Sequence, residues 1–120
     1  MANTDTIFTK IIKRELPAKI EYEDDDFIAF RDIHPKAPVH VLIVPKAAYA
    51  SLEEIPLEDT QSQAKLLQIV RKVAKKLGIL DNYKIAMNVG PQVQAVQHLH
   101  IHLMGGWKKI NTPEEVEVGF

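Results

Sequence analysis

The sequence predicts an α+β domain with a mostly antiparallel, five-stranded sheet and two helices. Two segments carry apolar residues at helical spacing, and five short segments are rich in alternating or β-branched residues. Their order, α-β-β-β-α-β-β, has hairpins and few crossovers and therefore favours antiparallel pairing. The chain has 120 residues, so we expect a single domain over 1–120 whose core needs no disulfide or metal.

Composition excludes several classes of function. Hydrophobic residues make up 46% and charged residues 26%, as in ordinary globular proteins, and the net charge is −1. We therefore expect neither nucleic acid nor an anionic membrane as a partner. The absence of cysteine excludes disulfides, thiol catalysis and cysteine-based zinc sites, and it suits a cytoplasmic protein. The polar start MANTDTIFTK has no signal core, and no apolar run approaches the ~18 residues that span a bilayer.

The first half of the chain predicts one helix and three strands, over 6–14, 18–22, 27–30 and 39–44. Isoleucine and phenylalanine recur at helical spacing in the helix, with Asp5 as its cap and Pro17 beyond its end. The acidic turn 23–26 joins the first two strands into a hairpin. The dense β-branched run that ends at Pro45 predicts a central strand.

The second half predicts a long helix after Pro56 and two further strands, over 83–88 and 98–104. Glu58 and Asp59 would lie in the first turn of this helix, where negative charge is stabilising, and Gly78 would end it. We expect one buried stripe on the helix, made of Leu66, Leu67, Val70, Val73, Ala74 and Leu77. Residues 1–4 are expected to be flexible, and 107–120 form a C-terminal tail.

The last predicted strand contains the segment QHLHIHL at 97–103, which holds three of the five histidines of the chain. Alternate side chains of a strand point to the same face, so His98, His100 and His102 would share one face. Their successive Cα atoms would lie ~6.5–7 Å apart. The intervening aliphatic residues would point into the core on the other face, so the strand is both anchored and able to present imidazoles.

Three interpretations of this row of histidines differ in chemistry. One is a solvated strand face whose histidines have no function. Another is a metal site, since His-x-His is a common zinc or iron pair and His34 or His40 could add a ligand, although the four residues directly after His102 include no carboxylate. The favoured one is nucleophilic catalysis at phosphorus. A neutral imidazole is a nucleophile near pH 7, its neighbours disfavour its protonation, and they can bind phosphate oxygens or move a proton.

The segment 98–104 also matches the pattern His-φ-His-φ-His-φ-φ, where φ is hydrophobic, which is the signature of the histidine-triad (HIT) family. Segments 6–20 and 30–45 resemble the Hint branch of that family, the purine nucleoside phosphoramidases, as do Met87-Asn88 and Gly105-Gly106. The resemblance covers roughly residues 6–106. It implies a HIT-like fold, a homodimer whose sheet continues across the interface, and a reaction that needs no metal or other cofactor.

The resemblance implies hydrolysis of nucleoside 5′-phosphoramidates, in which a purine nucleotide such as AMP or GMP is joined to an amine. His100 would attack the α-phosphorus and carry a covalent nucleotidyl group, and the carbonyl of His98 would orient its other ring nitrogen. His102 would bind phosphate, and His40 would stand behind the triad. These four histidines are therefore the expected catalytic residues.

The resemblance also implies the substrate-binding residues. The base pocket would consist of Ile7, Phe8, Ile11 and Phe30. The ribose hydroxyls would be bound by Asp32, with Ile33 against the nucleoside. The expected binding residues near the phosphate and the base are Asn88, Gln94 and Val96. Without the resemblance, the apolar members of this set would be read as ordinary core residues.

The sequence departs from the family pattern just before the triad. Gln92-Val93-Gln94-Ala95 stands where Gly-Gly-Gln followed by serine, glutamate or threonine is usual. Ala95 has no hydroxyl to pass a proton, so the donor to the leaving group stays open. Three alternatives also stay open: a dinucleoside polyphosphate hydrolase or nucleotidyl transferase of the same family, a purine-nucleotide-binding module with weak catalysis, and a metal-dependent enzyme.

Overall fold

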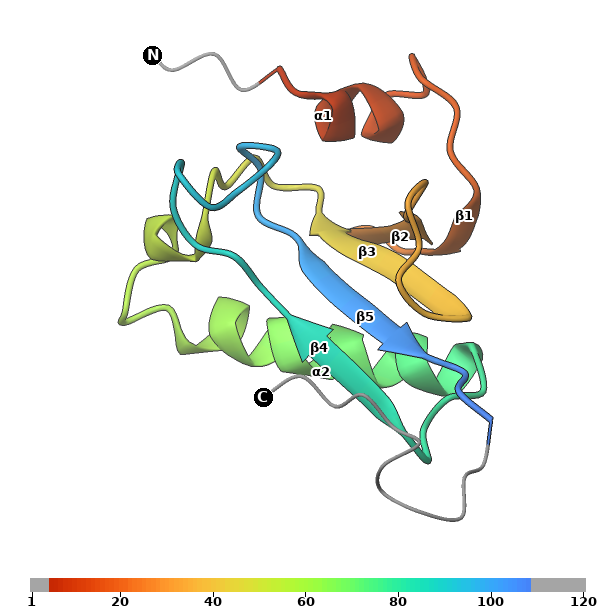
Figure 1. Ribbon diagram of the computed structural model, residues 1–120. Helices are drawn as coiled ribbons and strands as arrows, with labels where there is room; N and C mark the ends of the chain where they lie inside the picture. The colour runs from red at the N-terminus through yellow and green to blue at the C-terminus, as the bar shows by residue number, and fades with distance from the viewer. Residues whose placement is uncertain (1–4, 109–120) are drawn as a thin grey trace.

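The computed structural model describes residues 5–108, which form one antiparallel sheet with two α-helices (Figure 1). The strands have the spatial order β1-β2-β3-β5-β4, and each neighbouring pair is antiparallel. This confirms the predicted α+β class. In chain order the elements are α1 Ile7–Ile12, β1 Ile20–Glu23, β2 Phe27–Arg31, β3 Val39–Pro45, the 3-10 helix η1 Leu52–Glu54, α2 Thr60–Lys76, β4 Tyr83–Ala86 and β5 Ile101–Gly105. The predicted flexible segment 1–4 and residues 109–120 of the predicted tail 107–120 lie outside the described residues.

Helix α1 begins with a capping box. The Thr6 side chain accepts hydrogen bonds from the N–H groups of Phe8 and Thr9, both at 3.2 Å, and the Thr9 hydroxyl accepts one from the Thr6 N–H at 2.7 Å. The expected cap Asp5 is therefore wrong, and its carboxylate instead accepts from the Thr9 hydroxyl at 3.1 Å. The helix ends at Ile12, two residues earlier than predicted, because the chain turns at Arg14 with a φ of 65°.

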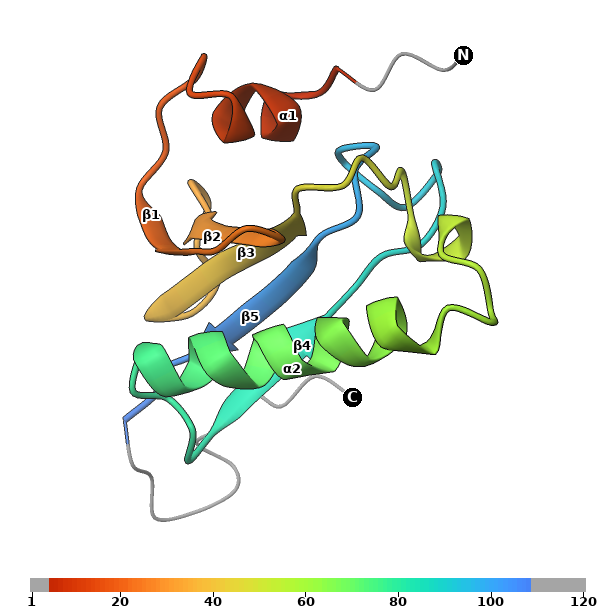
Figure 2. The same cartoon turned by 180° about the vertical axis from the view of Figure 1, so that it is seen from behind.

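The helices pack on opposite sides of the sheet (Figures 1 and 2). Alternate residues of β3 point to opposite faces, so Val41 and Ile43 meet α2 while Leu42 and Val44 meet α1. In Figure 2, which views the molecule from behind, α2 lies in front of the sheet. His40 has the parity of Leu42, which places it on the α1 side of the sheet.

The predicted stripe of α2 is correct except at one position. Leu67 is 62% exposed, whereas Ile69 is 2% exposed and completes the buried set with Leu66 and Val70. A helix turns by about 100° per residue, and the buried residues centre on the direction of Leu66, so Leu67 points away from the middle of the buried face. Asp59 lies just outside the helix as its N-cap, where its carboxylate accepts from the Ser62 N–H at 3.0 Å, and Glu58 precedes it.

The last strand is shorter than predicted, because β5 begins at Ile101 and not at His98. Its ladder with β3 starts where Ile101 lies opposite Ile43. Two residues further, Leu99 would lie opposite Pro45, which has no N–H for a ladder bond. The Leu99 N–H instead donates to the Tyr49 carbonyl at 2.8 Å. The first two histidines of the triad therefore precede the strand, and only His102 is part of it.

The predicted strand 83–88 ends earlier, at Ala86, and Gly78 ends α2 as expected with a φ of 72°. Within residues 5–108, no helix combines the length and apolar character that crossing a bilayer requires.

Candidate active site

The three histidines of the triad gather on the α1 side of the sheet, next to the Phe8 ring. The ring of Phe8 lies 5.0 Å from that of His100 and 6.1 Å from that of His98, both edge to face, and the His100 and His102 rings are 5.2 Å apart. The intervening Leu99, Ile101 and Leu103 lie in the cluster under α2, as predicted. The triad thus forms one connected set although two of its members lie before β5.

His98 is an anchor rather than an accessible group. It is 1% exposed, and its Nε2–H donates to the carbonyl of Pro45 at 2.8 Å. A carbonyl only accepts, so the proton is on Nε2. Burial lowers the pKa of His98, and the positive field of a protonated His100 would lower it further, while the bond to Pro45 opposes the shift. The ring is therefore neutral near pH 7 and ties the triad to the end of β3.

One ring nitrogen of His100 is hydrogen bonded to a backbone carbonyl, and the other ring nitrogen does not take part in that bond. Its Nδ1–H donates to the carbonyl of His98 at 2.7 Å, which is the hydrogen bond that the family resemblance led us to expect. Because the acceptor is again a carbonyl, a neutral His100 carries its unshared pair on Nε2. The ring is 5% exposed and is held edge to face by Phe8. This arrangement presents Nε2 in a fixed direction, as a nucleophile requires.

His102 and His40 form a hydrogen-bonded pair. A backbone N–H group of the loop 32–38 determines which ring nitrogens of the pair carry protons. The Lys36 N–H donates to Nδ1 of His40 at 3.0 Å, so a neutral His40 carries its proton on Nε2. Nε2 of His40 lies 3.0 Å from Nδ1 of His102, which must then accept. His102 is thereby left with its proton on Nε2, the ring nitrogen that points away from His40. The pair can donate one hydrogen bond from His102 to a ligand.

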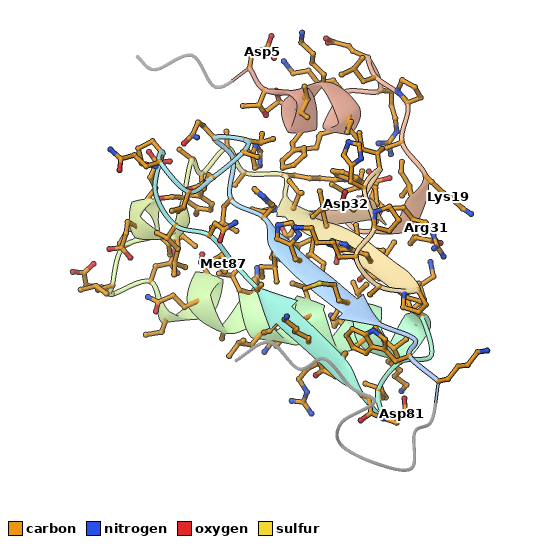
Figure 3. All side chains as sticks on the ribbon, viewed as in Figure 1. Asp5, Lys19, Arg31, Asp32, Asp81 and Met87 are labelled. Atoms are coloured by element: carbon orange, nitrogen blue, oxygen red, sulfur yellow. The ribbon has the colours of Figure 1, made fainter. Side chains whose placement is uncertain are left out.

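Burial is the largest cause of the lowered pKa values of His40 and His102. Asp32 opposes the shift in both rings, and Lys36 adds to it. The Oδ2 atom of Asp32 lies 3.5 Å from Nε2 of His40 and 3.9 Å from Nδ1 of His102. Both rings are thus neutral near pH 7, as the directed chain of hydrogen bonds requires. Asp32 is placed beside β3, below α1, in Figure 3.

The side-chain amide of Gln94, which is expected to lie near the phosphate, is hydrogen bonded within the protein. Its side-chain oxygen accepts from the Gly90 N–H at 2.8 Å. Its amide nitrogen donates to the carbonyls of Ala50 at 2.8 Å and Val96 at 3.1 Å. With both donors used and the residue buried, Gln94 braces the loop before the triad against the segment after β3. Any effect of this side chain on a ligand is therefore indirect.

The other predicted binding residues divide into buried and exposed groups. Phe8, Ile11 and Phe30 are packed with the apolar residues of β2 and β3 beneath α1, and Val96 packs against the same cluster. The exposed residues are Ile7, Ile33 and Asn88, of which Ile33 is 86% exposed. The buried group can form only the floor of a ligand site, whereas the exposed group can contact a ligand directly.

One cluster of described residues has the spacing of a metal site. Single ligand atoms of Asp32, His40 and His102 lie within 4.8 Å of one another, which a zinc ion with bonds of ~2.0–2.1 Å could bridge. The donor chemistry does not fit, however. With the Lys36 N–H on its Nδ1, a neutral His40 has a proton on Nε2, the atom that would face the metal. The cluster then offers two ligands, fewer than the three that open zinc sites use.

Sequence reasoning missed two groups that set the geometry, the Lys36 N–H and the Pro45 carbonyl. Both are backbone atoms, which every residue supplies, so no pattern of side chains marks them. Only the two prolines of the loop 31–38 hinted that its conformation is constrained.

Comparison with known proteins gives a consistent result. A family model described as the HIT domain matches residues 13–109. The chain is 41% identical over 104 residues to a purine nucleoside phosphoramidase of Escherichia coli, with 85% of this chain and 87% of that protein covered. It is 41% identical over 114 residues to a 14 kDa zinc-binding protein of Zea mays, covering 92% and 88%. The solved structure of a HIT family hydrolase from Clostridium thermocellum superposes with a TM-score of 0.79 at 43% identity, covering 93% and 99%. The chain therefore belongs to the HIT domain family.

Proposed function

We propose that this protein hydrolyses nucleoside 5′-phosphoramidates through a covalent nucleotidyl group on His100. The observation that carries the proposal is the 2.7 Å hydrogen bond from Nδ1 of His100 to the carbonyl of His98. It leaves the Nε2 pair of a neutral imidazole available, and such an imidazole is a competent nucleophile near pH 7. The Escherichia coli relative, named a purine nucleoside phosphoramidase, supports the choice of the P–N bond as the one cleaved.

The proposed reaction is a double displacement. The Nε2 pair of His100 attacks the α-phosphorus, and the P–N bond to the amine breaks as the bond to the ring forms. The amine nitrogen keeps the electron pair and takes a proton from a water molecule, while the Nε2–H of His102 donates a hydrogen bond to a phosphate oxygen. The hydroxide that remains attacks the phosphorus and displaces His100, whose Nε2 regains its unshared pair. The products are a nucleoside 5′-monophosphate and an amine, and both histidines end in their starting protonation states.

His102 is the proposed hydrogen-bond donor to the phosphate, and the leaving amine takes its proton from water because Ala95 has no hydroxyl at the position where serine is usual. Its Nδ1 lies 3.0 Å from Nε2 of His40, so its own proton is on Nε2. The side chain is 23% exposed, whereas His40 and His98 are nearly inaccessible. This Nε2–H can bind a phosphate oxygen throughout the reaction.

We assign the nucleoside to the surface next to α1. Phe8, Ile11 and Phe30 would form its floor, and the exposed side chains of Ile7 and Ile33 would contact the base. The ribose hydroxyls are assigned to Asp32, the phosphate to Asn88, and wall contacts to Val96. A purine nucleotide such as AMP or GMP is the expected ligand.

We also propose that the active form is a homodimer joined at β4. This strand is one edge of the sheet, and Ile85 on it is 42% exposed. Beside it is a groove of about 450 Å³ lined by Leu52, Gln63, Leu66, Leu67, Ile85, Ala86, Met87 and Ile101. The opposite edge strand β1 has an irregular register with its neighbour β2, which makes it the poorer edge for pairing. Pairing of two β4 edges would continue the sheet across the interface and cover this groove.

Two alternatives rest on the same site. A dinucleoside polyphosphate hydrolase or nucleotidyl transferase would use the same attack by His100 with a different leaving group. A purine-nucleotide-binding module with weak catalysis would bind AMP but turn over slowly. The cytoplasmic location expected from the composition stays a prediction.

The test is incubation with adenosine 5′-phosphoramidate, with AMP release followed by chromatography and the intact protein by mass spectrometry. The expected result is AMP release by the wild type, an adenylyl group on His100 after rapid quenching, and neither with His100→Ala. Diadenosine polyphosphate, tested in parallel, should be the poorer substrate. The proposal fails if the wild type releases no AMP from the phosphoramidate and no adenylyl group can be trapped.

A further inference from the structure

The backbone N–H of Lys36 has an unusual partner. It donates to Nδ1 of His40 at 3.0 Å, although Lys36 is an exposed loop residue and His40 is a buried residue of β3. The loop is held in place from two sides, because the Asp32 N–H donates to the His40 carbonyl at 3.0 Å and Asp32 Oδ1 accepts from the His34 N–H at 2.8 Å. The amide thus meets the ring in a constrained geometry.

This contact decides between two tautomers of His40. An N–H group can only donate, so Nδ1 of His40 must accept, and the proton of the neutral ring is confined to Nε2. Without the Lys36 N–H, either nitrogen of His40 could carry it. The chain of donation therefore has one direction: from the Lys36 amide to His40, from His40 to His102, and from His102 to whatever lies at its Nε2.

We infer that the Lys36 N–H is a positioning group that fixes the tautomers of His40 and His102 and thereby closes the Asp32–His40–His102 cluster to divalent metal ions. If His40 carried its proton on Nδ1, its Nε2 pair would face the cluster. Nδ1 of His102 and Oδ2 of Asp32 lie 3.0 and 3.5 Å from that atom, so three ligands would then be available. The hydrogen bond from the Lys36 N–H therefore decides between two states of the cluster. In one, His102 donates a hydrogen bond from Nε2; in the other, Asp32, His40 and His102 offer three ligands to zinc.

The tautomers are tested directly on the wild type, with no substrate present. Two-bond ¹H–¹⁵N correlation spectra distinguish a protonated ring nitrogen from an unprotonated one. At a pH where the rings are neutral, we expect His40 and His102 to be protonated on Nε2. Protonation of His40 on Nδ1 would overturn the inference, whatever the activity of the protein. Only the activity measurement below depends on the proposed function.

Lys36→Pro removes the N–H, and Lys36→Ala is its matched control because it removes the side-chain charge and keeps the amide. Ala37→Pro controls for a new proline in the same loop. The titrations use zinc alone, with a competing chelator. We expect Lys36→Pro to bind Zn²⁺ about 10- to 100-fold more tightly than Lys36→Ala, the range typical of altered outer-shell partners. Adding His40→Asn to Lys36→Pro should abolish this gain.

The phosphoramidase reaction gives a second comparison. We expect kcat of Lys36→Pro to be about tenfold below that of Lys36→Ala with little change in KM, because part of the molecules would present His102 without its outer proton. Equal zinc affinity in the two variants, or a gain that survives His40→Asn, would contradict the inference. If Lys36→Pro does not fold, the wild-type spectrum still decides. Inactivity of the wild type would overturn the proposed function and leave the tautomer result unaffected.

Discussion

The carbonyl of His98 accepts a hydrogen bond from Nδ1 of His100 at 2.7 Å, so the first histidine of the triad orients the second through its backbone. The His98 side chain is used elsewhere, since its Nε2–H donates to the carbonyl of Pro45. The His98 ring thus holds the chain in place, and the His98 carbonyl fixes the tautomer of His100. This division explains how a buried histidine could contribute to the proposed catalytic set without contacting substrate.

The buried histidines make stability depend on pH. The pKa values of His40, His98 and His102 are lowered by burial, so the unfolded chain binds more protons than the folded one when the pH falls below about 6.5, the ordinary value. Their contribution to stability is present at neutral pH and is lost as the pH falls. We expect the free energy of unfolding, measured in urea, to decrease between pH 7.5 and 5.5 by up to about 1.4 kcal/mol per pH unit for each of these histidines.

Three carboxylates with lowered pKa values do not obscure this effect. Glu23, Asp24 and Asp59 have lowered pKa values, so they stay ionised throughout the range from pH 7.5 to 5.5. The matched variants are His98→Gln, which should flatten the dependence, and His34→Gln in the exposed loop, which should preserve it. A wild-type protein whose unfolding free energy is constant over this range would contradict the assignment of neutral, buried rings.

Substitutions of Phe8 and Ile7 are expected to affect different properties. Loss of the Phe8 side chain should lower stability, and loss of the Ile7 side chain should weaken substrate binding. Phe8 is buried against His100 and Phe30, so Phe8→Ala should lower the free energy of unfolding by about 3 kcal/mol. Ile7, one residue earlier, is 52% exposed, so Ile7→Ala should cost less than about 1 kcal/mol. Its expected effect is a KM for adenosine phosphoramidate raised by about three- to tenfold. The reverse order of the two stabilities would refute the placement of α1.

Much of the fold could be predicted because it follows from side-chain periodicity. The run 39–44 and the alternation of aliphatic residues around the triad gave β3 and the buried face of β5 correctly. The start of β5 could not be predicted in the same way, since it depends on Pro45 of another strand lacking an N–H. The roles of ring nitrogens were also hidden, because they depend on the backbone of Lys36 and Pro45. Sequence patterns place side chains on faces but do not say which backbone groups they meet.

The hydrogen bonds that the Gln94 side-chain amide donates to two backbone carbonyls should be important for stability. Gln94→Glu keeps the shape but places a carboxylate against the carbonyls of Ala50 and Val96. We expect the free energy of unfolding to fall by about 2–4 kcal/mol and kcat to fall with it. Gln97→Glu is the control, because Gln97 is exposed and its amide donates to the Gln94 carbonyl at 3.0 Å, and it should cost less than about 1 kcal/mol. Thermal and urea unfolding of the two variants would check this, and equal losses would argue against a special role for Gln94.

The proposed dimer predicts that a charge on β4 produces monomers. Ile85 lies on the edge strand beside the apolar groove, so Ile85→Lys would place an ammonium group in the interface, where it cannot be hydrated. Light scattering after size-exclusion chromatography should give a dimer for the wild type and a monomer for Ile85→Lys at micromolar concentration. Leu16→Lys is the control, since Leu16 is also partly exposed, at 38%, and follows helix α1 in the sequence. Helix α1 lies at the opposite end of the molecule from β4 (Figure 1). A wild-type monomer, or a dimer that persists in Ile85→Lys, would exclude β4 as the interface.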